Sequence, residues 1–420
     1  MPEPREASPV FGIGCEVKGT KQMKTDKSVT LAKGRAIKFI VLLGVVSLFA
    51  DATYEGARSI TGPFLGSLGA SATVVGIVAG LGELIGYGLR LVSGYVSDRT
   101  GRYWAITLIG YVVNLLAVPV LALAGRWEIA AALIIAERFG KAMRNPPRDA
   151  MLSHATSEVG RGWGFGLHEA LDQIGAVLGP LIVSAVLFLK GTYQSSFAIL
   201  LIPALMAISI LVVARILYPV PRGMEVELDE PSRRGFPTVF WVYLVAVAFI
   251  AAGYADYPLI AYHFGKVSSV PRDWIPVFYA VAMGIDALAA LIFGRLFDRI
   301  GLAAMIGAVV LSVLFAPLVF LGGFGLALLG VALWGIGMGA QESIMRAAIA
   351  GMVPADLRGT AYGVFHTGYG VFWFAGSALM GYLYDISIPS LVVFAVAAQL
   401  ISIPIIALVK RIGPSTRRTA

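Results

Sequence analysis

Ionisable side chains inside long apolar runs are the first candidates for chemistry in this chain. Asp51, Glu55 and Arg58 stand in "ADATYEGAR" at i, i+4 and i+7, which places them on one helical face. Glu83 and Arg90, seven residues apart, share a face in the next run. Because charge in apolar surroundings is costly, such residues mark proton relays or substrate pathways. Asp51 and Glu83 are candidates for reversible protonation, and structural ion pairs are the alternative reading.

The fifth apolar run, "GFGLHEALDQIG", carries a second group of titratable side chains. His168 and Asp172 are spaced i, i+4, as are Glu169 and Gln173. A histidine titrates near neutral pH and could pass protons along a helix. A hydrogen-bonded packing role for His168 is the alternative.

Ionisable residues are sparser in the second half of the chain. Glu55 and Arg58 are expected near the outer mouth of the first run, and Arg90 is expected to partner Glu83. Together with the polar residues of the later runs, they form the candidate substrate cavity, whose members are Glu55, Arg58, Arg90, Asp256, Asp286, Gln341, Glu342 and His366.

The elements that must position these residues are membrane helices. The chain has 420 residues, of which 58% are hydrophobic and 14% charged, with a mean hydropathy of +0.80. Soluble domains average about 25% charged residues, so the composition indicates a polytopic membrane protein. One cysteine, Cys15, excludes an internal disulfide, and the four histidines show no metal-ligand spacing. We expect no metal site and no nucleic-acid partner, because the basic residues lie between apolar runs without a recognition motif.

Twelve apolar runs are long enough to cross a bilayer, which takes about 20 residues each. We place them near 38–57, 71–94, 103–124, 127–143, 164–189, 197–218, 238–262, 274–294, 302–322, 324–345, 360–384 and 389–410. The fourth run is expected to end at Pro146-Pro147, where Arg144, Arg148 and Asp149 form a gate network or anchor the helix end. The predicted units are an N-terminal tail (1–36), a six-helix bundle (37–218), a central loop (219–237), a second bundle (238–411) and a C-terminal tail (412–420).

Lysine and arginine fall mostly on one side of the predicted membrane. With the N-terminus inside, 26 lie in the tails and inner loops and five in the outer connections. Basic residues favour the cytoplasmic side. We therefore expect a multi-pass protein of the cell membrane, plasma or inner, with both termini in the cytoplasm.

The two halves share a loop motif at matching positions. "GYVSDRTG" at 94–101 and "GRLFDRIG" at 294–301 each follow the second run of their half, and "RGWGFG" and "RGTAYG" each open a fifth run. The candidate gate residues in these loops are Gly94, Asp98, Arg99, Gly101, Arg102, Gly294, Asp298 and Arg299. A duplicated six-helix unit is the simplest reading.

Twelve runs in two halves, with GxxxDRxGR after the second run, resemble the major facilitator superfamily. The resemblance implies an all-α fold of two six-helix bundles related by a pseudo-twofold axis, with substrate bound between them. It also implies that Gly94 lets the second helix approach a helix of the other half closely, while Asp98 meets the N-terminal end of the eleventh helix. Tyr103 departs from the family pattern, which has a basic residue there.

Two further features carry the family resemblance. Arg138 resembles an arginine of the fourth helix that supports proton coupling, although Gly140-Lys141 replaces the usual flank. Gly175, Gly179 and Pro180 match the GxxxGP core of an antiporter motif, whose final glycines are replaced by Val183-Ser184. The proton-coupling candidates are therefore Asp51, Glu83, Arg138, His168, Glu169 and Asp172.

These observations favour a secondary transporter driven by the proton gradient, without a cofactor, that exports a small organic solute. The alternative is a symporter that takes up a small organic anion, because Arg58, Arg90 and Arg138 would suit a carboxylate or phosphate. A non-transporting receptor or a membrane enzyme is a further class, although no catalytic constellation is visible, and we expect no enzymatic activity. The expected partners are the small-molecule substrate and the lipid bilayer, and the chain is expected to be a monomer.

Overall fold

The computed structural model describes residues 18–157, 161–219, 235–354 and 357–412. Within these ranges the chain is helical and contains no strand, which confirms the predicted all-α fold. Parts of the predicted tails and central loop, namely 1–17, 220–234 and 413–420, lie outside the described residues.

The first half supplies helices whose bounds are α1 (Lys18–Ser67), α2 (Ala72–Thr100), α3 (Tyr103–Val120), the 3-10 helix η1 (Leu121–Leu123), α4 (Trp127–Ser157), α5 (Arg161–Phe188), α6 (Tyr193–Ile199) and α7 (Leu201–Leu217). The second half supplies α8 (Thr238–Ala252), α9 (Tyr257–Val267), α10 (Ile275–Ile300), α11 (Ala303–Ser312), α12 (Phe315–Leu321), α13 (Phe324–Met352), α14 (Arg358–Ile386) and α15 (Ile388–Ile412).

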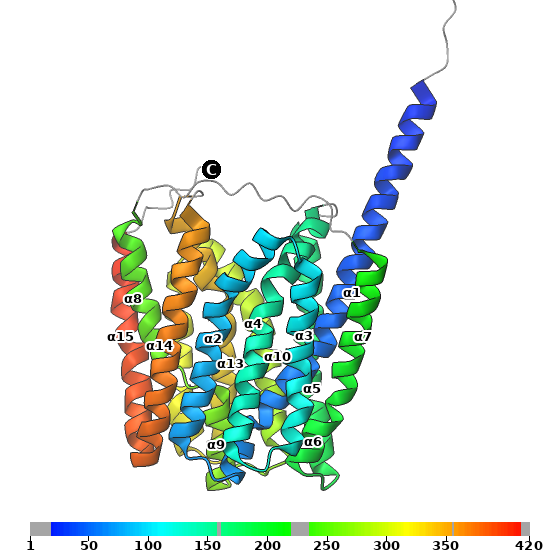
Figure 1. Cartoon of the computed structure of the whole chain (residues 1–420). Coiled ribbons are helices and arrows are strands. Elements are labelled where there is room, and N and C mark those ends of the chain that lie inside the picture. The colour runs from blue at the N-terminus through cyan, green and yellow to red at the C-terminus, as the bar shows by residue number, and fades with distance from the viewer. Residues whose placement is uncertain (1–17, 158–160, 220–234, 355–356, 413–420) are drawn as a thin grey trace, which may run out of the picture.

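These helices form the twelve predicted crossings. Among the described residues, 10 helical segments are long and apolar enough to span a membrane. The pairs α6/α7, α8/α9 and α11/α12 each make one such segment. Helices α4 and α14, with 31 and 29 residues, complete the set and stand beside the others in the bundle (Figure 1).

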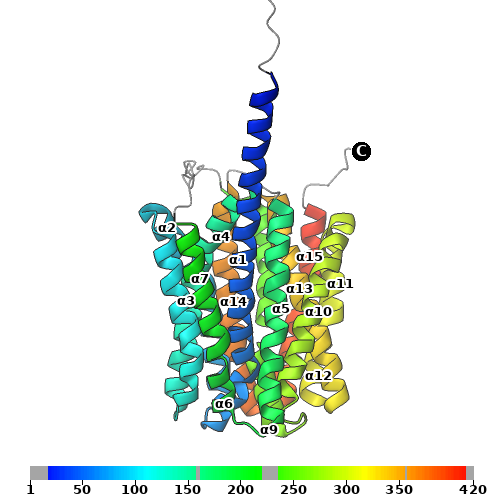
Figure 2. The ribbon, with the colours of Figure 1, turned by 90° about the vertical axis from the view of Figure 1, so that its right-hand side faces the viewer.

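Both described ends of the chain lie on the same side of the bundle. In Figure 1, α1 extends beyond the other helices at the top, and α15, the last described helix, ends on the same side. Figure 2 shows the same arrangement from the side, with the long helices running roughly along the vertical axis. We call this side the terminal face and the other side the opposite face.

Helix α4 continues past the point where the sequence predicts its end. Pro146 and Pro147 lie inside the helix, which runs to Ser157, so the predicted end at the two prolines is wrong. A proline lacks an N–H and leaves the carbonyl four residues earlier without its helical partner. For Pro147 that carbonyl belongs to Met143, and the Ser93 hydroxyl donates to it at 2.6 Å. A neighbouring helix thus satisfies the group that the proline frees.

Helix α1 is also longer than predicted. The predicted first span ends at residue 57, but α1 runs to Ser67 and carries Arg58 well inside the bundle. The expected place of Glu55 and Arg58 near the outer mouth is therefore wrong, since both side chains are buried.

A break in the seventh crossing separates α8 from α9. The chain leaves the helix at Gly253 and resumes at Tyr257, with a proline in the first turn of α9. Side chains from other helices satisfy the backbone at the break: Gln399 donates to the Gly253 carbonyl at 3.2 Å, and Trp334 donates to the Ala255 carbonyl at 2.9 Å. Irregular backbone at membrane depth is tolerated where protein groups satisfy it in this way.

The two halves pack most tightly near the opposite face. Helix α1 packs on α9, and α2 packs on α14. A Cβ added to Gly62 would overlap the Pro258 carbonyl, and one added to Gly76 would overlap the Ser377 carbonyl. Glycines allow this close approach of helix backbones.

Toward the terminal face, the glycines of α14 face side chains of α2. There a Cβ added to Gly370 or Gly363 would lie 3.2 Å from the side chain of Tyr87 or Leu91, respectively. The backbones of this helix pair thus approach more closely near the opposite face than near the terminal face. The halves are closed at the opposite face.

Candidate functional site

An arginine of the first half forms an ion pair with the second half in the middle of the bundle. Arg58 on α1 contacts Asp256, at the break between α8 and α9, at 2.7 Å. Both side chains are buried. The second Asp256 oxygen accepts from the Trp373 indole at 3.2 Å. The break in the seventh crossing therefore positions a carboxylate against α1.

Glu83 on α2 joins the same network. It contacts Arg58 at 3.1 Å and Arg138 of α4 at 3.2 Å. Both guanidinium groups also donate to the Tyr54 hydroxyl, from Arg58 at 3.0 Å. Arg138 makes a further contact with Glu137 at 3.5 Å.

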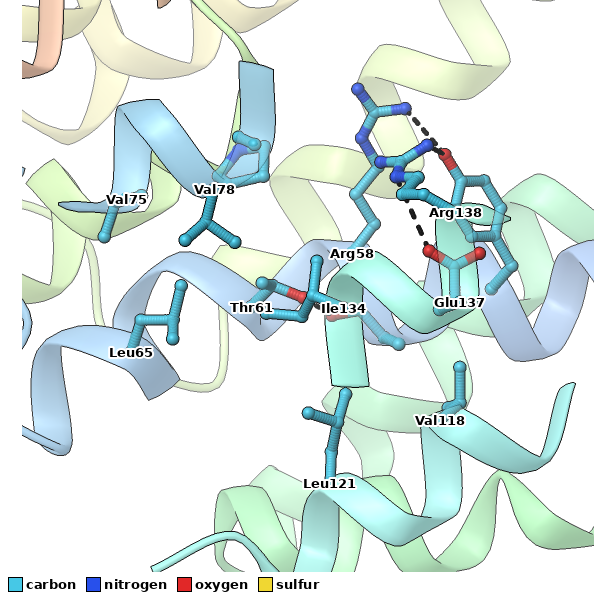
Figure 3. A pocket seen from close by; sticks show the side chains of 14 residues that line it. Arg58, Thr61, Leu65, Val75, Val78, Val118, Leu121, Ile134, Glu137 and Arg138 are labelled. Carbon is cyan, nitrogen blue, oxygen red and sulfur yellow. Dashed lines mark hydrogen bonds and ion pairs between the residues drawn. The ribbon is translucent and has the colours of Figure 1, made fainter. Parts of the chain in front are cut away.

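A small cavity borders this network and is lined by residues of the first half and by Pro258 of α9. Figure 3 shows Arg58, Glu137 and Arg138 at one side of it, while Leu65, Val75 and Leu121 form an apolar wall. Its volume is about 20 Å³, which is enough for one water molecule. The guanidinium groups of Arg58 and Arg138 therefore lie against apolar packing on one side and acids on the other.

Two more acids of α1 meet basic residues of α4. Lys141 lies 3.9 Å from Glu55, and its ammonium sits 3.5 Å from the centre of the Tyr54 ring. Arg144 contacts Asp51 at 3.5 Å. Arg144 was expected in a gate network or as a helix-end anchor, but its side chain is buried inside the first half.

The Tyr279 hydroxyl of α10 donates to Glu55. Together with the Arg58–Asp256 ion pair, this hydrogen bond makes a second polar link between the halves at mid-membrane. The first half thus carries most of the buried charge, and each link engages a residue of α1.

A cavity between the halves opens from this network toward the terminal face. Its inner part has a volume of about 120 Å³ and is lined by Glu55, Arg58, Glu83, Arg138, Lys141 and Trp373, among others. Its outer part has a volume of about 210 Å³. Tyr87, Arg90, Met338 and Glu342 line both parts.

The outer part of the cavity holds charged groups without a charged partner. Among the described residues, no ion pair within 4 Å involves Arg90, Glu169, Glu342 or Arg346, all of which line it. Arg90 lies over the Tyr87 ring at 5.2 Å. Groups of both signs are therefore available to a solute that enters this space.

An aromatic wall faces these charges. The rings of Tyr87 and His366 are stacked at 5.6 Å with an angle of 8°. Phe365 and Tyr369 continue the wall, and the Tyr369 hydroxyl donates to Gln341 at 3.1 Å. The predicted cavity residues His366, Gln341 and Glu342 thus meet in one place, which also contains Arg90.

Other predicted site residues lie deeper or to one side of the cavity. Asp286 is buried on α10. Asp172 accepts from the Ser47 hydroxyl. His168 is buried in α5 and does not line the described cavity.

The gate residues lie exposed at the terminal face. Asp98 and Arg99 at the end of α2, and Asp298 and Arg299 at the end of α10, are all exposed. Asp98 accepts a hydrogen bond from Tyr103 at 2.9 Å, within its own half. The expected contact between Asp98 and the eleventh crossing, which is α14, stays a prediction.

The glycines of the loop motif have distinct surroundings. Gly94 faces Pro146 and Gly294 faces Ser343, each within its own half. Gly101 caps α2 with a φ of 64°, and Gly301 ends α10 with a φ of 61°. Arg102 follows as the N-cap residue of α3. The second glycine of each motif thus supplies the left-handed backbone of a helix end.

Gly175 and Gly179 of the antiporter-like motif lie where α5 packs against α1. A Cβ on Gly175 would overlap the Leu48 carbonyl, and one on Gly179 would overlap the Ala52 carbonyl. Pro180 lies inside α5. The role of these glycines in this conformation is close packing within the first half.

Three residues of the site carry little signal in the sequence. Tyr54 and Tyr279 do not stand out from their neighbours, because tyrosines are common in apolar helices. Glu137 stands beside Arg138 in the sequence, and this direct adjacency could have drawn attention to it. It accepts from Asn114 at 2.5 Å and so ties α3 to α4.

Known proteins resemble the chain in sequence over most of its length. The family model described as "Major Facilitator Superfamily" matches residues 42–377. An uncharacterized protein of Mycobacterium tuberculosis is 42% identical and covers 90% of this chain and 95% of its own. An uncharacterized MFS-type transporter of Methanocaldococcus jannaschii is 26% identical, with 83% and 89% covered. A multidrug resistance protein, MdtH of Proteus mirabilis, is 32% identical over 29% of this chain and 30% of its own.

Solved structures share the fold. A nucleoside transporter, NupG, matches with a TM-score of 0.70 at 12% identity, over 89% of this chain and 98% of its own. A bacterial homologue of the lysosomal transporter Spinster matches with a TM-score of 0.70 at 13% identity, over 89% and 96%. The family match, the full-length relatives and the twelve-crossing fold agree, and the chain belongs to the Major Facilitator Superfamily.

Proposed function

We propose that this protein is a proton-coupled transporter that exports a small organic solute across the cell membrane by alternating access. The observation that carries the proposal is the cavity between the halves, which joins unpaired charged groups to a buried ion-pair network. Membership of the family supports transport in general. Proton coupling and direction are the proposed refinements, and they require no cofactor other than the proton gradient.

Glu342 is the proposed proton carrier. It lines both parts of the cavity, is open to it, and takes part in no ion pair among the described residues. Glu342 lies on α13, in the cavity between the two halves. Glu83, by contrast, is already engaged by two arginines in the ion-pair network.

The Arg58 network is the proposed link between the cavity and the movement of the halves. Arg58 contacts Glu83 in its own half and Asp256 in the other. A positive charge introduced near Glu83, or a proton on its carboxylate, would weaken the Arg58–Glu83 ion pair. Asp256 would then be the remaining acidic partner of Arg58. Binding in the cavity thereby changes the strength of a contact that crosses between the halves, and alternating access needs such a link.

The charge bias supports a cytoplasmic terminal face. Three basic residues counted with the inner loops, Lys141, Arg144 and Arg148, lie within α4, and Arg58 lies within α1. Without them, 23 of the basic residues counted belong to the predicted inner tails and loops and four to the predicted outer connections. The cavity then faces the cytoplasm, the side from which an exporter takes up its solute. The partial likeness to MdtH and the GxxxGP core also support export.

Uptake of a small organic anion by proton symport is the second candidate. Arg90 and Arg346 favour it, because both line the outer cavity without an ion-pair partner among the described residues. Two such guanidinium groups could hold a carboxylate or a phosphate. The neighbouring acids Glu169 and Glu342 speak against a purely anionic solute unless they are protonated.

A vesicle experiment distinguishes these functions. The purified protein is reconstituted in proteoliposomes that contain a pH-sensitive dye, and a panel of organic cations, zwitterions and anions is added in turn. The chain is expected to act as a monomer. Export by antiport predicts that adding an active solute outside drives protons out of the vesicle lumen.

Symport predicts proton entry together with the solute. Protein-free liposomes and a Glu128→Gln variant are the controls, because Glu128 is an exposed acid that pairs with Arg126 away from the cavity. If no solute of any class moves protons, while radiolabelled solute still crosses, then coupling to protons is rejected and family-level transport remains.

A further inference from the structure

Helices α2 and α14 end in the same five-residue pattern. Residues 94–98 read "GYVSD" at the end of α2, and residues 381–385 read "GYLYD" at the end of α14. Glycine, tyrosine and aspartate thus recur at identical spacing. The two helices run antiparallel and pack on each other across the interface between the halves. One GYxxD pattern therefore lies at the terminal face and the other at the opposite face.

The pattern at the opposite face makes a contact across the interface. The Asp385 carboxylate accepts from the backbone N–H of Ala72 at 3.1 Å and from that of Thr73 at 2.8 Å. It also accepts from the Thr73 hydroxyl at 2.6 Å. These groups open α2, and the first N–H groups of a helix have no partner within the helix. A carboxylate there is further favoured by the helix dipole.

Glycine in the same pattern brings the helix ends together. A Cβ on Gly381 would overlap the Ala72 carbonyl. Ser71, the N-cap residue of α2, uses its own side chain for the N–H of Val74 at 3.3 Å. The first half therefore caps one N–H of α2 with its own serine, and the second half supplies the partner for two others.

The pattern at the terminal face makes no such contact among the described residues. Asp98 is exposed, and its carboxylate is bonded to Tyr103 of its own half. The N-terminus of α14 has Leu357 as its N-cap residue, without a side-chain cap. Among the described residues, the start of α14 thus lacks the side-chain cap that the start of α2 has.

We propose that Asp385 is a cap that holds the opposite face closed, and that it alternates with the contact which the family resemblance implies for Asp98 at the terminal face when the halves rock. Each aspartate caps the N-terminus of the other helix of the pair. The two contacts exclude each other, because closing one end of a rocking helix pair opens the other. Asp385 is therefore a conformation-setting residue for the transport cycle.

This inference rests on the alternating access in the proposed function, but not on proton coupling, export or any solute. Its test is a distance measurement between the halves, which needs no substrate. If the distances respond as expected while no proton movement is found, only the coupling proposal fails. If proton movement is found and the distances do not respond, only this inference fails.

Pairs of spin labels report the two faces. The background is Cys15→Ser, which removes the single cysteine. Lys190→Cys with Lys266→Cys places labels on the two halves at the opposite face, and Thr100→Cys with Ile300→Cys places them at the terminal face. All four positions are exposed. Pulsed electron resonance then gives the distance distribution of each pair in nanodiscs.

Asp385→Ala is expected to lengthen the Lys190–Lys266 distance and shorten the Thr100–Ile300 distance. The ratio of open to closed populations at the opposite face should rise about tenfold, which corresponds to about 1.4 kcal/mol. Adding Asp98→Ala to Asp385→Ala should reverse this shift, because the conformation gained would lose its own cap. Thr73→Val removes only the hydroxyl contact and should give a smaller shift in the same direction.

Glu128→Ala is the matched control, since Glu128 is an acid near the opposite face that pairs within the first half. The proposal is overturned if Asp385→Ala gives the same two distributions as the parent and the control. It is also overturned if Asp98→Ala leaves the shift caused by Asp385→Ala unchanged. If Asp385→Ala fails to fold, Thr73→Val is the deciding variant. Distance distributions of Thr73→Val that are identical to those of the parent overturn the proposal.

Discussion

At the scale of single residues, the site is a set of shared ion pairs. Arg58 has two acidic partners, Asp256 and Glu83, while Glu83 has two basic partners. Breaking a buried pair costs more than the pair contributes, because the remaining charge is left without compensation. The number of partners that remain after a substitution therefore decides its effect on stability.

Removing Arg58 should destabilise the protein more than removing Asp256. Arg58→Leu leaves Asp256 with only the Trp373 indole, and the loss should reach about 3 kcal/mol or more. Asp256→Asn leaves Arg58 with Glu83, so the loss should be smaller. Thermal unfolding of the purified variants in detergent measures both changes. Arg126→Leu is the control, because the exposed Arg126–Glu128 pair should contribute at most about 1 kcal/mol. Equal losses for Arg58→Leu and Asp256→Asn would refute this ranking.

At the scale of helices, glycines set how closely the halves approach. Gly62 on α1 faces the Pro258 carbonyl of α9, whereas a Cβ added to Gly88 inside α2 would have nothing within 4 Å. Alanine in place of glycine stabilises an isolated helix by about 1 kcal/mol. An overlap with backbone costs about 1–3 kcal/mol. The surroundings of each glycine therefore decide whether alanine raises or lowers the stability of the protein.

Gly62→Ala should therefore lower the thermal unfolding midpoint and slow transport, while Gly88→Ala should keep or raise the midpoint. Unfolding in detergent and solute exchange in proteoliposomes check the two effects. If Gly62→Ala matches Gly88→Ala in both measurements, the backbone contact between α1 and α9 is not required for closure of the opposite face.

The helices also show where prediction from sequence succeeds and fails. Apolar runs predict the twelve crossings, because burial in a bilayer depends mainly on local composition. The sequence predicts the ends of α1 and α4 too early, because a charged residue such as Arg58 and a proline pair such as Pro146-Pro147 are typical of helix boundaries. Their compensation comes from Asp256, 198 residues away from Arg58, and from Ser93 on another helix. Local sequence carries no signal for such distant partners.

The sequence likewise predicts one part of the candidate site and not the other. Glu83, Arg138, Glu342 and His366 stand out because charged or polar residues are rare in membrane helices. Which of them are paired could not be predicted, since pairing depends on how the two halves meet. Asp385 lies near a helix end, where an aspartate is ordinary, so only the contact with α2 reveals its role.

At the scale of the whole molecule, two bundles close at one face and leave a charged cavity toward the other. The ion-pair network lies at the inner end of that cavity, and Glu342 lies on its wall between the bundles. In the proposed mechanism, a proton taken up by Glu342 from the cavity changes the charge that both halves experience. Coupling through Glu342 is the central claim.

Transport by Glu342→Gln in proteoliposomes tests this claim most directly, with an active solute from the panel of cations, zwitterions and anions. Glutamine resembles the protonated acid, so we predict that transport driven by a pH gradient falls at least tenfold, while solute counterflow without a gradient stays within about twofold of the parent. Glu128→Gln should leave both unchanged. Gradient-driven transport by Glu342→Gln at the parental rate would contradict proton coupling through this residue.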